Sequence, residues 1–375
     1  MGFVVLSFLI LISSDFLISY LAPFFIPYLG FFPYTDFLKK FHLPNFITAQ
    51  ANFDGVHYLK IASKGYEQYT QAFFPLYPLS IHYVSRFFNT VNYLIVALLI
   101  SNIFFFFGLF IFKKYLEQFL PKEKVFWTII FLLTFPTSFF LHAVYPHGLF
   151  IFALASSLLF MRKKKYLLAS FAAALSSTIR LIGIFIFIPF LLTIFNDKKR
   201  KIIHFLYALT PFIGLAAYSI YLYKTTGDPF YFFNSQPAFG ANRSTSLISL
   251  PQVYFRYLKI FTSASLNFQF LVSLFEFFVF TFVFGCLLWQ LKTLLKEKNK
   301  NTDLLGLNLF SIAAILLPTL TGTFSSIPRY ALEAPAFFIF LAQIKNIKIK
   351  FSLVLVFAIL HVVLLAFFTQ GYFVS

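Results

Sequence analysis

Long apolar runs separated by short polar stretches dominate the pattern of residues along this chain. An apolar segment of about 20 residues is long enough to cross a bilayer as a helix. The pattern therefore predicts an all-α polytopic membrane protein, a bundle of about 11 transmembrane helices with the N-terminus inside and the C-terminus outside. The predicted spans are residues 3–32, 91–112, 124–141, 146–161, 166–179, 181–195, 202–223, 270–291, 304–322, 330–344 and 350–369.

One apolar segment, Phe73–Phe88, is left out of this count because it contains two prolines, a histidine and an arginine. Counting it as a span would place the lysines at 113–114 on the opposite side of the membrane from the basic run at 162–165. We therefore interpret Phe73–Phe88 as a helix that lies at the outer interface. Two predicted spans on either side of Arg180 are also short, and we expect half-buried helices that meet at a polar turn there.

The spans predict one integral membrane domain, residues 1–375, with two long extracytoplasmic loops at 33–90 and 224–269. The short turns near 142–146, 180 and 323–329 fall on the same side as these loops. The N-terminal apolar run has no basic segment before it and carries Asp15, so we interpret it as the first span rather than a signal peptide. Most polar residues outside the basic clusters are therefore predicted to lie on the extracytoplasmic side.

Composition supports the membrane assignment and explains the charge. The chain is 60% hydrophobic and 11% charged, with a mean hydropathy of +0.83, so most of its surface must face lipid. A net charge of +18 is also typical of nucleic-acid-binding proteins, but most of the 30 lysines and arginines lie in short clusters between apolar segments. This distribution is expected of cytoplasmic loops and gives no support to a nucleic-acid partner. The clusters are Lys113, Lys114, Lys122 and Lys124; Arg162–Lys165; Lys198–Lys201; Lys292, Lys296, Lys298 and Lys300; and Lys345, Lys348 and Lys350.

The charges outside these clusters are the candidates for chemistry. Arg180 and Arg329 each lie between apolar segments, where an ionised side chain costs roughly 2.5–3.5 kcal/mol at mid-bilayer. Each arginine either reaches the interface along its aliphatic stem or faces a cavity and holds a phosphate, for which a planar guanidinium is suited. Among the acids on the outer side, Asp54 and Asp36 are the candidates for a general base.

The run from Phe53 to Pro78 carries a resemblance to a known family. Its aromatic-Asp-Gly start, Ile-Ala pair, Gly-Tyr and closing Phe-Phe-Pro-Leu-Tyr-Pro resemble the first-loop signature of the PIG-V-type (GPI mannosyltransferase 2-like) membrane mannosyltransferases of the GT-C superfamily. Phe53 replaces the usual tryptophan. The matching positions are Asp54, Gly55, Tyr58, Ile61, Ala62, Gly65, Tyr66 and Phe73–Pro78.

Further matches follow in the order of the family. They are Pro136–Phe140 with Tyr145 and Leu149–Phe150, then Arg180 with Gly183, then Gly227–Pro229 with Gln236, and last Pro328–Tyr330. One departure is that His147 stands where the family commonly has a glutamate. This histidine is either a structural residue or a contact to substrate phosphate.

The resemblance implies a GT-C-type fold with an extracytoplasmic active site that transfers a sugar, typically mannose, from a polyprenyl-phosphate donor of the dolichol-phosphate type. It favours Asp54 as the base of an inverting displacement, with Asp36 as a second candidate carboxylate. Arg180 and Arg329 would stabilise the leaving phosphate. The other expected substrate-binding residues are Tyr58, Tyr66, Tyr77, His147 and Gln236.

Several alternatives stay open at this point. A transporter or flippase of a lipid-linked glycan, and a GT-C transferase for another lipid-linked sugar, also fit charges among spans. The acceptor is a glycan, a glycolipid or a protein. We find no phosphate-binding glycine loop and no metal-ligand spacing, so no cofactor and no metal are predicted. The compact, Lys-, Asn- and Phe-rich chain favours the cell membrane of a prokaryote over the endoplasmic reticulum.

Overall fold

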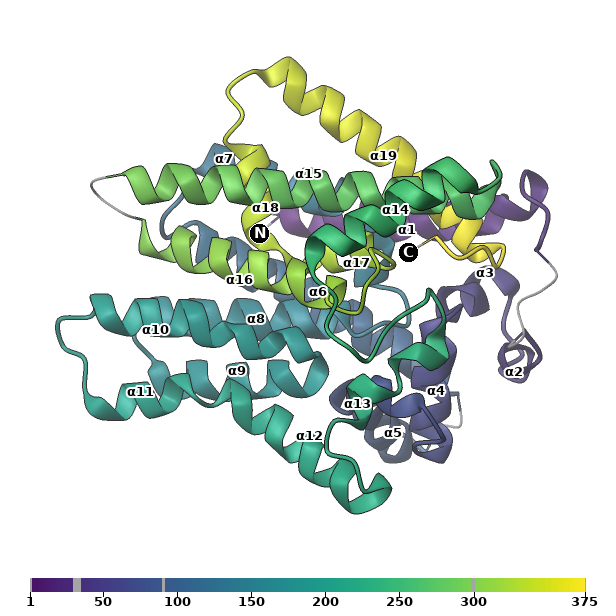
Figure 1. Ribbon diagram of the computed structural model, residues 1–375, viewed down its shortest axis with the longest axis horizontal. Helices are drawn as coiled ribbons and strands as arrows, with labels where there is room; N and C mark the ends of the chain where they lie inside the picture. Colours follow the sequence, from purple (N-terminus) through teal and green to yellow (C-terminus); the bar gives the residue numbers. More distant parts are fainter. Residues whose placement is uncertain (1, 30–34, 90–91, 298–300, 375) are drawn as a thin grey trace.

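The computed structural model describes residues 2–29, 35–89, 92–297 and 301–374, and this part of the chain is helical with no strand (Figure 1). The all-α prediction is therefore confirmed. Within this described part, five helices are long and apolar enough to cross a membrane, or six if one bent pair forms a single span. The five are α1 (Gly2–Leu21, extended by a 3₁₀ turn to Phe24), α6 (Tyr93–Leu116), α15 (Phe268–Lys296), α16 (Thr302–Thr319) and α19 (Ile347–Thr369).

The predicted count of about 11 spans is not confirmed, because the other apolar segments form shorter helices. These are α7 (Lys122–Thr134), α8 (His147–Arg162), α9 (Tyr166–Ile179), α10 (Phe187–Asn196), α11 (Ile202–Ala208), α12 (Pro211–Thr226) and α18 (Pro335–Ala342). The α11–α12 pair is bent by 46°. Helix α8 shows why hydropathy overcounts: nearly all of its residues are buried against other helices, including α6 and α9, so its apolar sequence serves protein packing.

Two local predictions agree with the structure. Helix α9 ends at Ile179, Arg180 is extended, and a 3₁₀ helix (Leu181–Ile186) leads into α10, so two short helical segments do meet at Arg180. The segment predicted as an interfacial helix contains α5 (Leu76–Phe87), which packs on α4 (Asp54–Lys64) and α6. Its position relative to a membrane stays a prediction.

Five further helices remain in the described residues, and four of them are only four or five residues long. They are α2 (Thr35–Lys39), α3 (Asn45–Thr48), α13 (Tyr231–Asn234), α14 (Leu250–Ser263) and α17 (Ile327–Tyr330). The predicted loop 33–90 thus contains α2 to α5, with residues 33, 34 and 90 outside the described part of the chain. The predicted loop 224–269 contains α13 and α14.

Two ion pairs connect the basic cluster Arg162–Lys165 to neighbouring helix ends at one end of the bundle. Arg162 at the end of α8 pairs with Asp303 at the start of α16, and Lys164 Nζ lies 2.8 Å from Asp197 Oδ1 just after α10. In Figure 1 the α10–α11 connection lies at the left of the molecule, whereas α4, α14 and the C-terminus lie toward the right. Lys298 and Lys300, in the fourth cluster, are outside the described residues. The segments that carry the motif residues therefore occupy the end away from the Arg162–Lys165 cluster.

A buried polar network joins the first and last long helices. Asp15 on α1 accepts hydrogen bonds through Oδ2 from His142 Nε2 and through Oδ1 from His361 Nε2 on α19, both at 2.8 Å. The His361 Nδ1 atom lies 3.0 Å from the Ser138 hydroxyl. A buried carboxylate is costly unless it is hydrogen-bonded, and here both of its oxygens are satisfied. The network fixes α1 and α19 against the segment that follows α7.

Candidate active site

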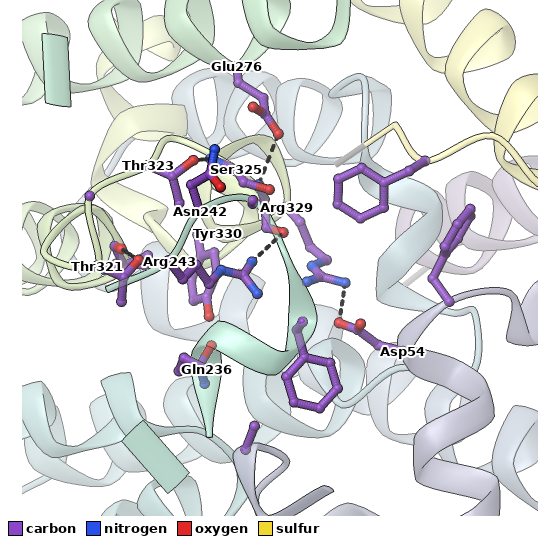
Figure 2. A pocket seen from close by; sticks show the side chains of 18 of the residues that line it. Asp54, Gln236, Asn242, Arg243, Glu276, Thr321, Thr323, Ser325, Arg329 and Tyr330 are labelled. Carbon is purple, nitrogen blue, oxygen red and sulfur yellow. Dashed lines mark hydrogen bonds and ion pairs between the residues drawn. The ribbon is translucent and has the colours of Figure 1, made fainter. Parts of the chain in front are cut away.

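A cavity of about 1450 Å³ opens between α4, α13, α14, α15, α17 and the C-terminal segment. Among the described residues, five basic side chains and two carboxylates line it, together with apolar and aromatic groups. The charged lining residues are Asp54, Arg180, Arg243, Arg256, Lys259, Glu276 and Arg329. Figure 2 shows several of them around the same space. A large cavity with convergent polar groups is where binding or chemistry is expected in an all-helical protein.

Asp54 lies at the cavity wall because of how α4 begins. The helix starts at Asp54, so its carboxylate sits in the first turn, where the helix dipole stabilises negative charge. The preceding Phe53 has φ 60 and ψ −118, a left-handed conformation that is unusual for a residue with a side chain. Such strain persists only where the surroundings impose it and is concentrated at functional sites. Gly55 gives α4 close access to Val144, whose carbonyl oxygen would lie 3.2 Å from an added Cβ.

Arg329 on α17 forms an ion pair with Asp54, with 2.7 Å between Nη1 and Oδ2 (Figure 2). The Arg329 side chain is 9% exposed and that of Asp54 26%, so solvent screens the pair only weakly. Burial raises the pKa of the Asp54 carboxyl group and is the largest single effect, but the charges of Arg329, His57 and Arg243 together outweigh it. The pKa of Asp54 therefore lies below its usual value, and the group is ionised at neutral pH.

The segment around Tyr145 holds both members of this pair. The Tyr145 hydroxyl donates to the Asn52 carbonyl oxygen at 2.8 Å, two residues before Asp54. The Arg329 guanidinium lies over the Tyr145 and Phe140 rings, 5.3 Å from each centroid. Thr137 donates to the Pro328 carbonyl oxygen at 2.7 Å. The match at 136–145 thus has a structural role, because it aligns the Asp54 segment with the Arg329 segment.

Arg180 pairs with a second acid, the buried Glu333, which its local sequence does not mark as a site residue. Arg180 Nε lies 3.0 Å from Glu333 Oε2, and His147 Nδ1 lies 2.8 Å from Glu333 Oε1. Arg180 Nη1 is also 3.1 Å from His147 Nε2, and since a guanidinium only donates, the imidazole proton belongs on Nδ1. The guanidinium stacks on the Tyr330 ring, 4.5 Å from its centroid. His147 is fully buried and is absent from the described cavity lining, so its contacts in this structure are structural.

The other predicted site residues are divided between the cavity and the protein interior. Tyr58 and Gln236 line the cavity. Tyr66 donates to the Phe73 carbonyl oxygen at 2.8 Å, and Tyr77 is fully buried against Ser101, so neither is part of the described lining. Asp36 is on the surface of α2 with its side chain 92% exposed, 3.2 Å from Lys39, and does not join Asp54.

Four further charged residues of the described cavity lining were missed as candidates: Arg243, Arg256, Lys259 and Glu276. Glu276 in α15 accepts hydrogen bonds from the Tyr257 hydroxyl at 2.8 Å and from the backbone N–H of Ser326 at 3.1 Å. Arg243 and Arg256 come from the segment before α14 and from α14 itself. The three basic residues lie outside the basic clusters, but nothing in their local sequence separates them from ordinary loop or helix charges. Glu276 carried a clearer signal, because it is the only charged residue in the apolar run 268–291.

Within the described residues, no group of three or more His, Cys, Asp or Glu side chains is arranged to hold a metal ion. The absence of a metal and of a cofactor stays a prediction. Comparisons with protein-family models, with curated proteins and with solved structures find no match to this chain.

Proposed function

We propose that the protein is a glycosyltransferase that moves a sugar from a polyprenyl-phosphate donor to an acceptor hydroxyl, with inversion at the anomeric carbon. The observation that carries the proposal is the Asp54–Arg329 pair on the wall of a cavity of about 1450 Å³. Pockets for one drug-sized ligand measure roughly 300–1,000 Å³, so this cavity has room for a glycosyl phosphate and an acceptor together. The resemblance of Phe53–Pro78 to the mannosyltransferases makes mannose the proposed sugar.

In the proposed step, Asp54 acts as the general base. Arg329 holds Oδ2, which leaves Oδ1 to accept the proton of the attacking hydroxyl. The acceptor oxygen bonds to the anomeric carbon as the bond from that carbon to the phosphate oxygen breaks, and the electron pair leaves with the lipid phosphate. Protonation of Asp54 removes the counter-charge of Arg329 while negative charge grows on the phosphate. The cationic cavity wall then stabilises the leaving group.

The distribution of basic residues between the two ends of the bundle supports an extracytoplasmic position for the cavity. The ion pairs of the Arg162–Lys165 cluster lie toward one end, near the α10–α11 connection, and the cavity lies toward the other (Figure 1). Because lysine and arginine are enriched in cytoplasmic loops, this arrangement favours a cavity on the outer side of a cell membrane. The proposed acceptor is a glycan, glycolipid or protein that carries a free hydroxyl on that side.

The experiment is a transfer assay on membranes that contain the protein, with labelled polyprenyl-phosphate mannose as donor. The wild type is expected to form a covalent labelled product, and Asp54→Asn is expected to reduce the rate by at least a hundredfold. Asp36→Asn is the matched control because the same change falls on an exposed acid outside the cavity.

Wild-type transfer by a folded Asp54→Asn variant would disprove the role of the base. Movement of label across the membrane without a new bond would indicate a transporter. A donor series with other polyprenyl-phosphate sugars, such as glucose, tests the choice of mannose.

A further inference from the structure

The cations that line the cavity fall into two groups. Arg180 and Arg329 are each paired with a carboxylate, Glu333 and Asp54 respectively. Among the described residues, Arg243 and Arg256 have no carboxylate within ion-pair distance. A guanidinium that faces a cavity without a counter-ion is a site for an anionic ligand, because each planar fork can donate two parallel hydrogen bonds to phosphate oxygens.

Both arginines are fixed to the segment that leads to Arg329. Arg243 approaches the Ser326 hydroxyl at 3.5 Å, and Arg256 donates from Nη1 to the Gly322 carbonyl oxygen at 3.0 Å. Backbone bonds from the 244–248 segment to residues 320–321 hold the Arg243 region in place. The two guanidinium groups therefore belong to one wall of the cavity.

Arg243 is also within electrostatic range of the proposed base. Its charge contributes to the lowered pKa of Asp54, although the two side chains form no ion pair among the described contacts. Figure 2 draws Arg243 and Arg329 on the cavity wall, with Asp54 beyond Arg329 in this view. A ligand that spans the space from Arg243 to Asp54 would thus carry negative charge at one end and its reactive carbon at the other.

Helix α14 provides an apolar surface next to this wall. Arg256, Lys259 and Ile260 line the cavity at helical spacing, while Phe255 and Leu258 on the other side of the helix are 61% and 54% exposed. Large exposed apolar side chains are expected where a helix contacts lipid. The side of α14 that faces the cavity is therefore cationic, and its opposite side is apolar. A ligand with an anionic group and a hydrocarbon tail can contact both.

We propose that Arg243 and Arg256 form the binding site for the phosphate group of a lipid-linked substrate, separate from the Asp54–Arg329 pair. This assignment rests on the proposed function for its choice of a lipid-linked donor. It moves the phosphate contact from Arg180 and Arg329, which are already paired with acidic side chains, to the cations that are not. In this assignment Arg329 keeps Asp54 ionised, and Arg243 stabilises the negative charge of the leaving phosphate.

The test measures binding, so it does not depend on turnover. Full-length protein in lipid nanodiscs is titrated with a polyprenyl monophosphate, with the matching polyprenol, with phosphatidylglycerol and with inorganic phosphate. The wild type is expected to bind the polyprenyl monophosphate at least tenfold more tightly than the other three ligands. Arg243→Gln and Arg256→Gln are each expected to weaken that binding about tenfold or more, and to leave polyprenol binding unchanged.

Arg86→Gln is the matched control, because Arg86 is an exposed arginine outside the described lining. Two cavity variants are used so that a folding defect in one does not remove the test. Equal affinity of the wild type and both folded variants for the polyprenyl monophosphate would overturn the site. Equally tight binding of phosphatidylglycerol or inorganic phosphate would overturn its assignment to a polyprenyl phosphate.

The two proposals fail separately. If the wild type transfers sugar and Asp54→Asn does not, but Arg243→Gln and Arg256→Gln bind the lipid phosphate normally, the phosphate site is wrong and the transferase stands. If phosphate binding requires Arg243 and Arg256 but no sugar is transferred by the wild type, the site stands and the transferase is wrong.

Discussion

At the scale of single residues, the Asp54–Arg329 pair sets the pH range in which the proposed base can act. Only the ionised carboxylate can accept a proton, and the nearby charges, of which Arg329 is the strongest, outweigh burial and hold its pKa below the usual value. Ionisation is therefore complete at neutral pH and is lost only as the pH falls below the ordinary carboxyl range. A low pKa also makes Asp54 a weak base, so proton transfer is expected late in the step, when the bond to the anomeric carbon has made the acceptor hydroxyl acidic.

Removal of the Arg329 charge should shift the pH at which activity is lost on the acid side of the profile. In Arg329→Gln the pKa of Asp54 is expected to rise, so kcat/KM should begin to fall at a higher pH than in the wild type. The measurement is the pH dependence of residual kcat/KM, which reports the ionisation of the free enzyme. Arg86→Gln serves as the control and should leave the limb in place. An unchanged limb in Arg329→Gln would mean that Arg329 does not set the ionisation of the base.

Glu333 is expected to matter for stability through Arg180. Glu333→Gln leaves the Arg180 guanidinium without a counter-charge in a buried site, which should cost about 3–5 kcal/mol of unfolding free energy. The Arg180→Gln, Glu333→Gln double variant removes both charges and should lose less than the sum of the single variants. Thermal unfolding of the four proteins gives the coupling. Strict additivity would contradict the pairing.

The sequence could identify Asp54, Arg180 and Arg329 because each stands out from an apolar background or carries the motif. The structure brings all three to one cavity. Their partners could not be predicted in the same way. Glu333 pairs with Arg180 across 153 positions of the chain. Tyr77 is fully buried and therefore does not line the cavity. Neither fact can be inferred from the residues next to these positions.

At the scale of elements, the turn at Arg180 depends on a close approach between two helices. A Cβ added at Gly183 would lie 2.5 Å from backbone atoms of Ser176 and Ser177 in the last turn of α9. Because backbone atoms cannot move aside as a flexible side chain can, the 3₁₀ helix after Arg180 requires glycine there. This contact directs Arg180 toward the cavity and Glu333.

Gly183→Ala should therefore lower stability by about 1–3 kcal/mol or more through overpacking. Gly285→Ala on α15 is the matched control, since an added Cβ there meets nothing within 4 Å, and its effect should stay within about 1 kcal/mol. Both variants are compared by thermal unfolding in the same detergent. Equal melting temperatures would show that α9 and the following helix can separate without loss.

The apolar segments form helices, as the pattern predicted, but many of these helices are shorter than the membrane spans that were predicted for them. Residues 124–141 become α7 and a short 3₁₀ turn, with Pro136 between them, and 330–344 contains only the short α18 as an apolar helix. Hydropathy records that a segment avoids water, but α8 shows that the neighbour can be protein instead of lipid. The length of each apolar segment, and the prolines and turns that interrupt it, therefore indicate whether it can cross a membrane better than its hydropathy does.

At the scale of the whole molecule, the separation of charges predicts which end faces which compartment. Lys163 belongs to a basic cluster, and Lys259 is an exposed residue of the cavity lining. In a Cys286→Ser background, Lys163→Cys and Lys259→Cys should react with a membrane-impermeant maleimide from opposite sides of sealed vesicles. Lys259→Cys should react from the extracytoplasmic side. Labelling of both from one side would contradict the proposed orientation.

The network around Asp15 has a consequence for how the chain is assembled during synthesis. The carboxylate enters the membrane with α1, its first histidine partner follows 127 positions later, and the second follows 346 positions after Asp15. Until α19 is made, Oδ1 of this carboxylate lacks its His361 partner and keeps only a long hydrogen bond of 3.4 Å from the Ser14 hydroxyl, so the buried group is poorly satisfied. Synthesis of α19 thus completes the partners of Asp15, and we expect a chain truncated before α19 to be less stable than the full chain.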